Sequence, residues 1–364
     1  MNVLQRLLIR GISALLPDVR TQYPRIRRLQ EPRLPLLQPV WQGFDLLLRG
    51  DGRPVPLRIF EPGQNSPLPD PSVTAAKLVL DADRGPEIPP PLLEHVHEAA
   101  PPTGLILFFH GGGWVTGTID SYSAFCAAAA RWTGWPVISV DYRLAPEHPF
   151  PAALNDCRTV AGFLYRAAPQ LGILPENIVL MGDSAGGNLA AALALYARTM
   201  GHPVPRRQIL LYPALSGDYG PDSRFASMHE HGEHWLLTRE RIGAYMDLYL
   251  SRPEDRENPL SAPLLARSLH DQPETLVITA EYDPLRDEGE AYAARLVADG
   301  NAAMAIRVLH TLHGYMGAPG QGSATAATWC LILPWLGLER PAELLAAGGE
   351  HPVEWRVGRP GADG

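Results

Sequence analysis

The sequence predicts an α/β fold whose central sheet is mostly parallel and flanked by helices. Short apolar runs of the kind found in strands buried on both faces recur along the chain, at 105–109, 137–140, 178–181, 208–211, 275–280 and 305–309. Stretches with helical character lie between these runs, at 121–132, 152–168, 185–200, 284–298 and 323–336. Strands that alternate with helices indicate parallel pairing through right-handed crossovers.

The segments before the first buried strand follow other patterns. Leucines and isoleucines at helical spacing in 4–16 predict an amphipathic helix that ends near Pro17. Seven arginines before position 34 make peripheral contact with a membrane an alternative to packing over the body. Runs at 41–49 and 55–60 around Gly50-Asp51-Gly52 predict a hairpin. Residues 62–103 are rich in proline and read as a surface excursion with one weakly apolar piece at 75–80.

The alternation of strands and helices lapses between Pro213 and Pro273. This stretch is rich in histidine, arginine and acidic residues, and it holds one predicted helix at 238–250. We expect it to be an insertion that lies over one face of the sheet. The polar, Gly/Pro-rich end at 348–364 is expected to be loose.

Composition narrows the class of protein. The chain has 364 residues, 46% of them hydrophobic, which is enough for one large α/β domain with an elaboration or for two small domains. A net charge of −8 argues against nucleic-acid binding. Three widely spaced cysteines suggest buried free thiols. Because neither a signal-peptide core nor a membrane span is found, a cytoplasmic protein is expected.

The segment 178–193 is the centre of the chemical prediction. Gly182, Ser184 and Gly186 have the spacing of a nucleophile elbow, a tight strand-to-helix turn that exposes a serine at its apex. A phosphate loop would place a lysine beside the serine, and a dinucleotide fingerprint would read G-x-G-x-x-G. Neither pattern is present. The alternative is a Gly-rich helix start capped by Ser184 or Asp183.

Three other strand ends offer groups that complete a serine-nucleophile site. A serine hydroxyl needs a base, and the base needs a group that fixes its orientation. Asp283 and His313 supply these in the order Ser, Asp, His along the chain. The glycine triplet after the strand at 105–109 provides backbone donors, so Gly111, Gly112 and Ala185 are expected to form an oxyanion hole.

Each candidate has a structural alternative. His110 is expected to orient the glycine loop rather than titrate, and Asp283 before Pro284 would by itself suit a helix N-cap. His310 is the rival base, but it falls at the end of the predicted strand, whereas His313 lies in the loop beyond. The group His229, His231 and His234 raises the idea of a metal site, yet its spacing favours a solvated loop, so neither a metal nor a cofactor is expected.

Five motifs together resemble the hormone-sensitive-lipase family of serine esterases, also called bacterial family IV. They are HGGGW at 110, DYRLAPEHPFPAAL at 141, GDSAGGNLA at 182, DPLRDEG at 283 and HGY at 313. The resemblance covers about 104–338 and implies the α/β-hydrolase fold with a helical cap. It implies a cap segment at 1–40, core parts at 41–212 and 274–340, a cap insertion at 213–273 and a C-terminal tail at 341–364. The excursion 62–103 is longer than is usual there.

The resemblance also implies roles for single residues. Ser184 would be the nucleophile, Asp283 and His313 its partners, and Gly111, Gly112 and Ala185 the oxyanion hole. His110 and Gly113 would support the site, and Glu147 would anchor the segment 141–151 that braces the glycine loop.

The function expected is cofactor-independent hydrolysis of carboxylic esters with short- to medium-chain acyl groups. Acyl transfer through the same acyl-enzyme is the first rival. The second is a non-catalytic ligand-binding protein on this scaffold, like the plant gibberellin receptors, which lack the catalytic histidine. The expected partner is a small-molecule ester, and a homodimer is allowed although the sequence selects no surface for it.

Overall fold

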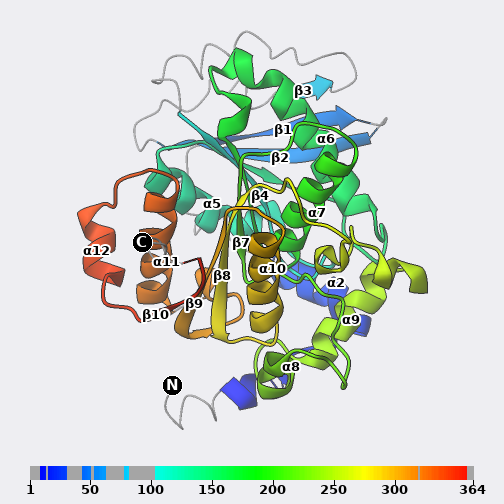
Figure 1. Ribbon diagram of the computed structural model, residues 1–364. Helices are drawn as coiled ribbons and strands as arrows, with labels where there is room; N and C mark the ends of the chain where they lie inside the picture. The colour runs from blue at the N-terminus through cyan, green and yellow to red at the C-terminus, as the bar shows by residue number, and fades with distance from the viewer. Residues whose placement is uncertain are drawn as a thin grey trace.

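The computed structural model describes residues 9–13, 15–30, 43–50, 53–62, 78–81, 103–318 and 320–358, and these form one sheet with helices on both faces (Figure 1). The strands are β1 (Gly43–Gly50), β2 (Arg53–Phe60), β3 (Leu78–Asp81), β4 (Leu105–Phe109), β5 (Val137–Val140), β6 (Ile178–Asp183), β7 (Arg207–Leu211), β8 (Glu274–Tyr282), β9 (Ala303–Leu312) and β10 (Val353–Val357). Their order across the sheet is β10-β9-β8-β7-β6-β4-β5-β2-β1-β3.

The central strands β5, β4, β6, β7, β8 and β9 run parallel to one another. Among the strands that the structure describes, the antiparallel pairs are β2 with β1, β2 with β5, and β10 with β9. Strand β4 is buried along its whole length, as its run of large apolar residues requires. The carboxyl ends of the parallel strands therefore share one edge of the sheet, where ligands bind in open α/β folds.

Helices cover the sheet in two layers. Helices α6 (Ala152–Ala167), α7 (Ala185–Thr199) and α10 (Arg286–Ala298) bury their apolar sides in one core, on the right of Figure 1. Helices α5 (Ile119–Thr133) and α11 (Gly322–Trp335) pack in the second core, and α12 (Ala342–Gly348) lies beside α11. No helix of the described residues is both long and apolar enough to span a bilayer.

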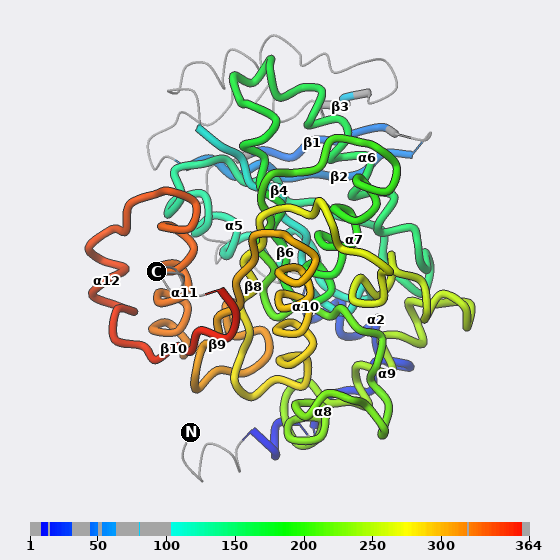
Figure 2. The backbone as a smooth tube through the Cα atoms, viewed as in Figure 1, coloured from blue at the N-terminus to red at the C-terminus, as the bar shows by residue number. Residues whose placement is uncertain are grey.

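Two segments far apart in sequence meet over the carboxyl edge of the sheet. Helix α2 (Val19–Gln30) lies beside α9 (Arg239–Tyr249), as Figures 1 and 2 both show. An ion pair of 3.0 Å between Arg20 and Asp247 joins them. Helix α8 (Ala226–His231) comes from the same insertion as α9. The two segments expected to form a cap, 1–40 and 213–273, thus each contribute one helix to this pair.

The α/β prediction is confirmed, and most predicted elements lie within a few residues of their expected places. The hairpin forms as β1 and β2, and the three cysteines are buried free thiols. Residues 63–77 and 82–102 of the Pro-rich excursion lie outside the described residues, and so do residues 4–8 and 14 of the first predicted helix. The weakly apolar piece at 75–80 overlaps β3.

The prediction of a loose C-terminal end is wrong for residues 348–358. Strand β10 pairs with β9 and extends the sheet by one antiparallel strand, which Figure 2 shows beside β9. No residue of β10, Trp355 included, is fully buried. An outer strand of this kind does not need the apolar run that marks the inner strands, and the sequence of β10 has none. The backbone ladder and the contact with β9 hold this strand in place.

Candidate active site

Ser184 occupies a sharp turn between β6 and α7. Its backbone angles, φ 53° and ψ −118°, lie in a region that residues other than glycine rarely adopt. The turn closes because two glycines leave room for backbone contact. A Cβ at Gly182 would lie 2.3 Å from the Gly186 carbonyl oxygen, and one at Gly186 would lie 1.9 Å from the Phe109 carbonyl oxygen. The predicted elbow is therefore present, and it presents the Ser184 hydroxyl at the start of α7.

A chain of two hydrogen bonds joins Ser184 to His313 and Asp283. The distance from His313 Nε2 to Ser184 Oγ is 2.8 Å, and that from His313 Nδ1 to Asp283 Oδ2 is 2.7 Å. Asp283 is fully buried after β8, and its other oxygen accepts a bond from the Leu285 N–H. With Nδ1–H donating to the carboxylate, Nε2 is free to accept the serine proton.

His310 takes no part in this chain. It lies at the end of β9 with φ 61°, and its side chain is exposed. Its ring faces Glu281, with 3.5 Å between Nδ1 and the carboxylate, and its N–H donates to the same carboxylate. The structure thus brings His313, and not the rival histidine, to the serine.

The buried side chain of His110 contacts the glycine loop after β4. Burial without a charged partner lowers the pKa of His110 to about 4, so the ring is neutral near pH 7. Its Nδ1 lies 2.8 Å from the Gly111 carbonyl oxygen, and the ring stacks on Tyr142, whose hydroxyl donates to the His110 carbonyl. His110 therefore contacts both the glycine loop and the segment that carries Tyr142.

Gly111 lies against Asp183 and Tyr122. A Cβ at Gly111 would be 2.7 Å from the Asp183 carboxylate and from the Tyr122 hydroxyl, and its backbone N–H interacts with that carboxylate. The residues of the loop that line the cavity at Ser184 are Gly112 and Gly113, with φ of 111° and 61°. A glycine triplet shows that the loop can turn, but the direction of each N–H depends on its φ and ψ angles.

Asp183 and Tyr122 are site residues that the sequence analysis missed. Tyr122 Oη donates to Asp183 Oδ2 at 2.9 Å, directly behind the nucleophile. Burial raises the pKa of Asp183 to about 6. Asp183 lies between Gly182, which ends the apolar run 178–181, and Ser184. Its place at the end of a buried strand was the signal in the sequence that it would be buried.

Glu147 braces the glycine loop through an arginine of the N-terminal segment. Arg27 of α2 makes two bonds of 2.9 Å to the Glu147 carboxylate and also donates to the Val115 and Ala145 carbonyls. The Ala145 N–H in turn donates to the Trp114 carbonyl at 2.9 Å. The segment 141–151 therefore contacts the glycine loop directly. The half-exposed Glu147 pairs with Arg27 and so links α2 to this segment.

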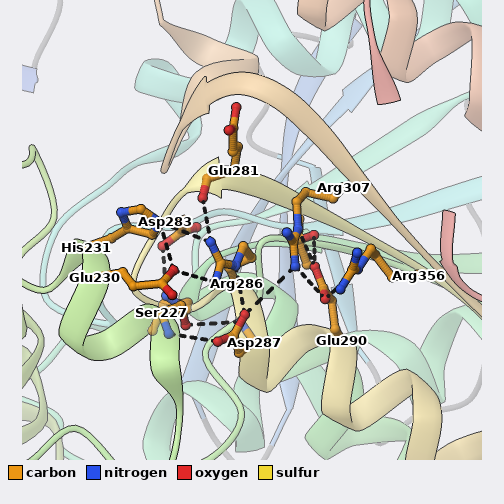
Figure 3. Close-up of polar contacts among 12 residues, drawn as sticks. Ser227, Glu230, His231, Glu281, Asp283, Arg286, Asp287, Glu290, Arg307 and Arg356 are labelled. Carbon is orange, nitrogen blue, oxygen red and sulfur yellow. Dashed lines mark hydrogen bonds and ion pairs between the residues drawn. The ribbon is translucent and has the colours of Figure 1, made fainter. Parts of the chain in front are cut away.

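A network of charged side chains joins the insertion to the segment that carries Asp283 (Figure 3). Arg286 binds Asp287 at 2.7 Å and Glu230 of α8 at 2.8 Å, and the Asp287 carboxylate accepts the Ser227 N–H. His231 also contacts Arg286, at 3.0 Å.

The histidines of the insertion were expected in a solvated loop, and this expectation is wrong for two of them. His229 and His231 lie in α8 and make structural contacts because this helix packs on α10.

Within the described residues, no three histidine, cysteine or acidic side chains gather as metal ligands do. His234 is exposed, with its ring near Glu233.

Glu288 ties the start of the insertion to α10. It is fully buried and accepts hydrogen bonds from the Leu215 N–H and from the Ser216 and Tyr219 hydroxyls. Burial raises its pKa to about 8, so the folded protein keeps a proton there that the unfolded chain loses near pH 4.5.

We expect Glu288 to make the free energy of unfolding fall as pH rises from 5 to 8, since only the folded state holds the proton in that range. Glu288→Gln should reduce this fall by at least about 2 kcal/mol. Urea unfolding at several pH values measures the slope, with the exposed Glu176→Gln as the matched control. Equal slopes in wild type and Glu288→Gln would show that the carboxyl ionises normally.

The cavity at Ser184, here called the reaction pocket, has a volume of about 210 Å³. The elbow and the glycine loop line one side of it. Residues of the insertion also line it, namely Leu236, Leu237, Arg241, Ile242 and Tyr245. Tyr245 packs on Gly113, where a Cβ would come within 2.3 Å of its ring. Trp114 stacks on Tyr249 at 4.4 Å, so the loop and α9 are packed together.

Known proteins resemble this chain in both sequence and structure. A family described as alpha/beta hydrolase fold matches residues 106–317. Carboxylic ester hydrolase LipN of Mycobacterium tuberculosis (strain ATCC 25618 / H37Rv) is 41% identical over 62% of this chain and 60% of LipN, so the match spans less than two thirds of that relative. Ethyl acetate hydrolase of Pseudomonas putida is 32% identical over 73% of each protein. The esterase of Pyrobaculum calidifontis superposes with a TM-score of 0.72 at 29% identity, covering 92% of this chain and 98% of that one.

The fold and the site define an α/β hydrolase, and the chain belongs to the alpha/beta hydrolase fold family. Within that fold it is a member of the hormone-sensitive-lipase family, family IV, to which its esterase relatives belong.

Proposed function

We propose that the protein hydrolyses carboxylic esters through an acyl-enzyme on Ser184. The observation that supports this most is the unbroken hydrogen-bonded chain from Ser184 through His313 to the buried Asp283, at the floor of a pocket. His313 Nε2 takes the proton as Ser184 Oγ attacks the ester carbonyl carbon. The carbon–oxygen bond to the alcohol then breaks, and His313 returns the proton to the leaving oxygen.

Water completes the cycle. His313 removes a proton from a water molecule, whose oxygen attacks the acyl-enzyme carbonyl, and the proton returns to Ser184 as the acid leaves. Asp283 stays ionised in this scheme: it keeps the imidazole in place and stabilises the imidazolium that forms at each step. The reaction requires no redox change.

For the oxyanion hole we propose the backbone N–H groups of Gly112, Gly113 and Ala185, with Gly111 replaced by Gly113. The first two lie in the part of the loop that borders the pocket, and Ala185 is the first residue of α7, whose N–H has no acceptor within its helix. Each donor to the tetrahedral oxyanion is worth about 3 kcal/mol of transition-state stabilisation.

A pocket of about 210 Å³ supports short acyl groups as the substrates. The expected preference is for butyrate esters over emulsions of long-chain triglycerides. A higher rate on the triglycerides would contradict this proposal.

The function is tested with p-nitrophenyl butyrate and an active-site label. We expect release of p-nitrophenol and butyric acid, and we expect a p-nitrophenyl alkylphosphonate to abolish turnover after modifying one residue per chain. Peptide mass spectrometry should locate the phosphonate on Ser184. Product analysis with added alcohol separates hydrolysis from acyl transfer, because transfer gives a new ester in place of the acid. A folded protein that cleaves none of a panel of acyl esters would refute the proposal.

A further inference from the structure

A second cavity adjoins the reaction pocket on the side of the N-terminal segment. This cap cavity has a volume of about 680 Å³ and lies between α2, the residues before it, and α9. Pro17, Thr238 and Gly243 are among the residues that line it. Among the described residues, Arg241 is the one that lines both the cap cavity and the reaction pocket. Arg241 is therefore the residue at which the two spaces meet.

Arg241 is held at both its ends. Its backbone N–H donates to the side chain of Thr238, the N-cap of α9, at 3.2 Å. Its guanidinium Nη1 donates to the Pro17 carbonyl oxygen at 3.1 Å, across the gap between α9 and the start of α2. A long side chain tied at its tip loses much of its rotamer freedom, so it can act as a wall.

Other walls of the reaction pocket are fixed by the fold. The glycine loop and the elbow are backbone, and Tyr245 is packed against Gly113. The cap cavity, in contrast, has open space beside α9, because a Cβ added at Gly243 meets no atom within 4 Å. Arg241 is therefore the lining residue whose loss would extend the reaction pocket toward that space.

We propose that Arg241 is the specificity-determining residue of this site: it closes the reaction pocket against the cap cavity and restricts the ester group on that side to a short one. This inference rests on the proposed ester hydrolysis. Removal of the side chain joins the two spaces, and each further methylene that becomes buried raises kcat/KM by about fourfold.

The test compares wild type, Arg241→Ala and Arg241→Lys on two ester series. In one series the acyl chain grows from acetate to decanoate on p-nitrophenol; in the other the alcohol grows on acetate. Arg241→Ala should raise the ratio of kcat/KM for the octanoyl substrate over the butyryl substrate, or the matching alcohol ratio, by at least about tenfold. Arg241→Lys, which keeps most of the side-chain length and a donor for the Pro17 carbonyl, should keep the wild-type profile. The series that shifts identifies the group that faces Arg241.

Gly243 provides an independent variant. Gly243→Leu should fill part of the cap cavity, leave the wild-type profile unchanged, and reverse the gain when combined with Arg241→Ala. An Arg241→Ala protein with the wild-type Tm and the wild-type profile in both series would overturn the inference. A shortened profile in Gly243→Leu alone would also overturn it, because wild type would then already use the cap cavity. Absence of ester hydrolysis in wild type would instead refute the proposed function.

Discussion

Replacing Ser184 by Ala is expected to lower kcat for p-nitrophenyl butyrate by about five to six orders of magnitude. The reason is that the residual site can polarise the carbonyl but has no group to form the acyl-enzyme, and removal of one member of a catalytic triad costs nearly as much as removal of all. Steady-state hydrolysis measured at high enzyme concentration gives the residual rate. KM should change little, since the hydroxyl contributes little to binding of the ground state.

Two controls show whether a loss of activity in Ser184→Ala comes from the missing hydroxyl. Ser251 is an exposed serine after α9, so Ser251→Ala is a matched control that should keep full activity. Ser184→Ala should also unfold at a Tm close to that of wild type, because the Cβ stays and the backbone of the elbow need not move. Retention of more than about one per cent of wild-type activity by a folded Ser184→Ala protein would exclude Ser184 as the nucleophile.

Replacing His313 by Ala is expected to lower kcat by about five orders of magnitude or more. Without the imidazole, Ser184 loses the acceptor for its proton. Asp283 cannot replace it, because the carboxylate bonds the opposite nitrogen of the ring and is held there by the Leu285 N–H. The same hydrolysis assay measures the loss, and phosphonate labelling of Ser184 should slow in parallel because it needs the same base.

The matched control is His310→Ala, three residues earlier in the chain. That ring is exposed and faces Glu281, so its removal should change kcat/KM by less than about threefold. The opposite outcome, a large loss in His310→Ala with activity kept in His313→Ala, would exchange the roles of the two histidines and require that the loop after β9 rearrange during the reaction.

Much of this site could be predicted because the fold turns sequence order into spatial proximity. Ser184, Asp283 and His313 each follow an apolar run, and parallel strands end at one edge of the sheet. Recognising the strands was therefore enough to gather three side chains that are up to 129 residues apart. The spacing of Gly182 and Gly186 around the serine added the local geometry.

What the sequence did not reveal depends on direction or on distant pairs. The choice between Gly111 and Gly113 as an amide donor depends on φ and ψ angles that a run of identical residues does not encode. The bonds of Arg27 to Glu147 and of Arg241 to Pro17 join residues 120 and 224 positions apart. Arg27 meets Glu147 where the N-terminal segment packs on the segment 141–151, and Arg241 meets Pro17 where the N-terminal segment packs on the insertion. No local sequence pattern predicts such contacts.

The backbone at Ser184 has one more consequence. Its φ of 53° and ψ of −118° suit glycine, and a serine there costs about 1 to 3 kcal/mol. Glycine at this position would relieve that cost but would have no hydroxyl, so the serine gives up some stability for the group that the proposed reaction needs.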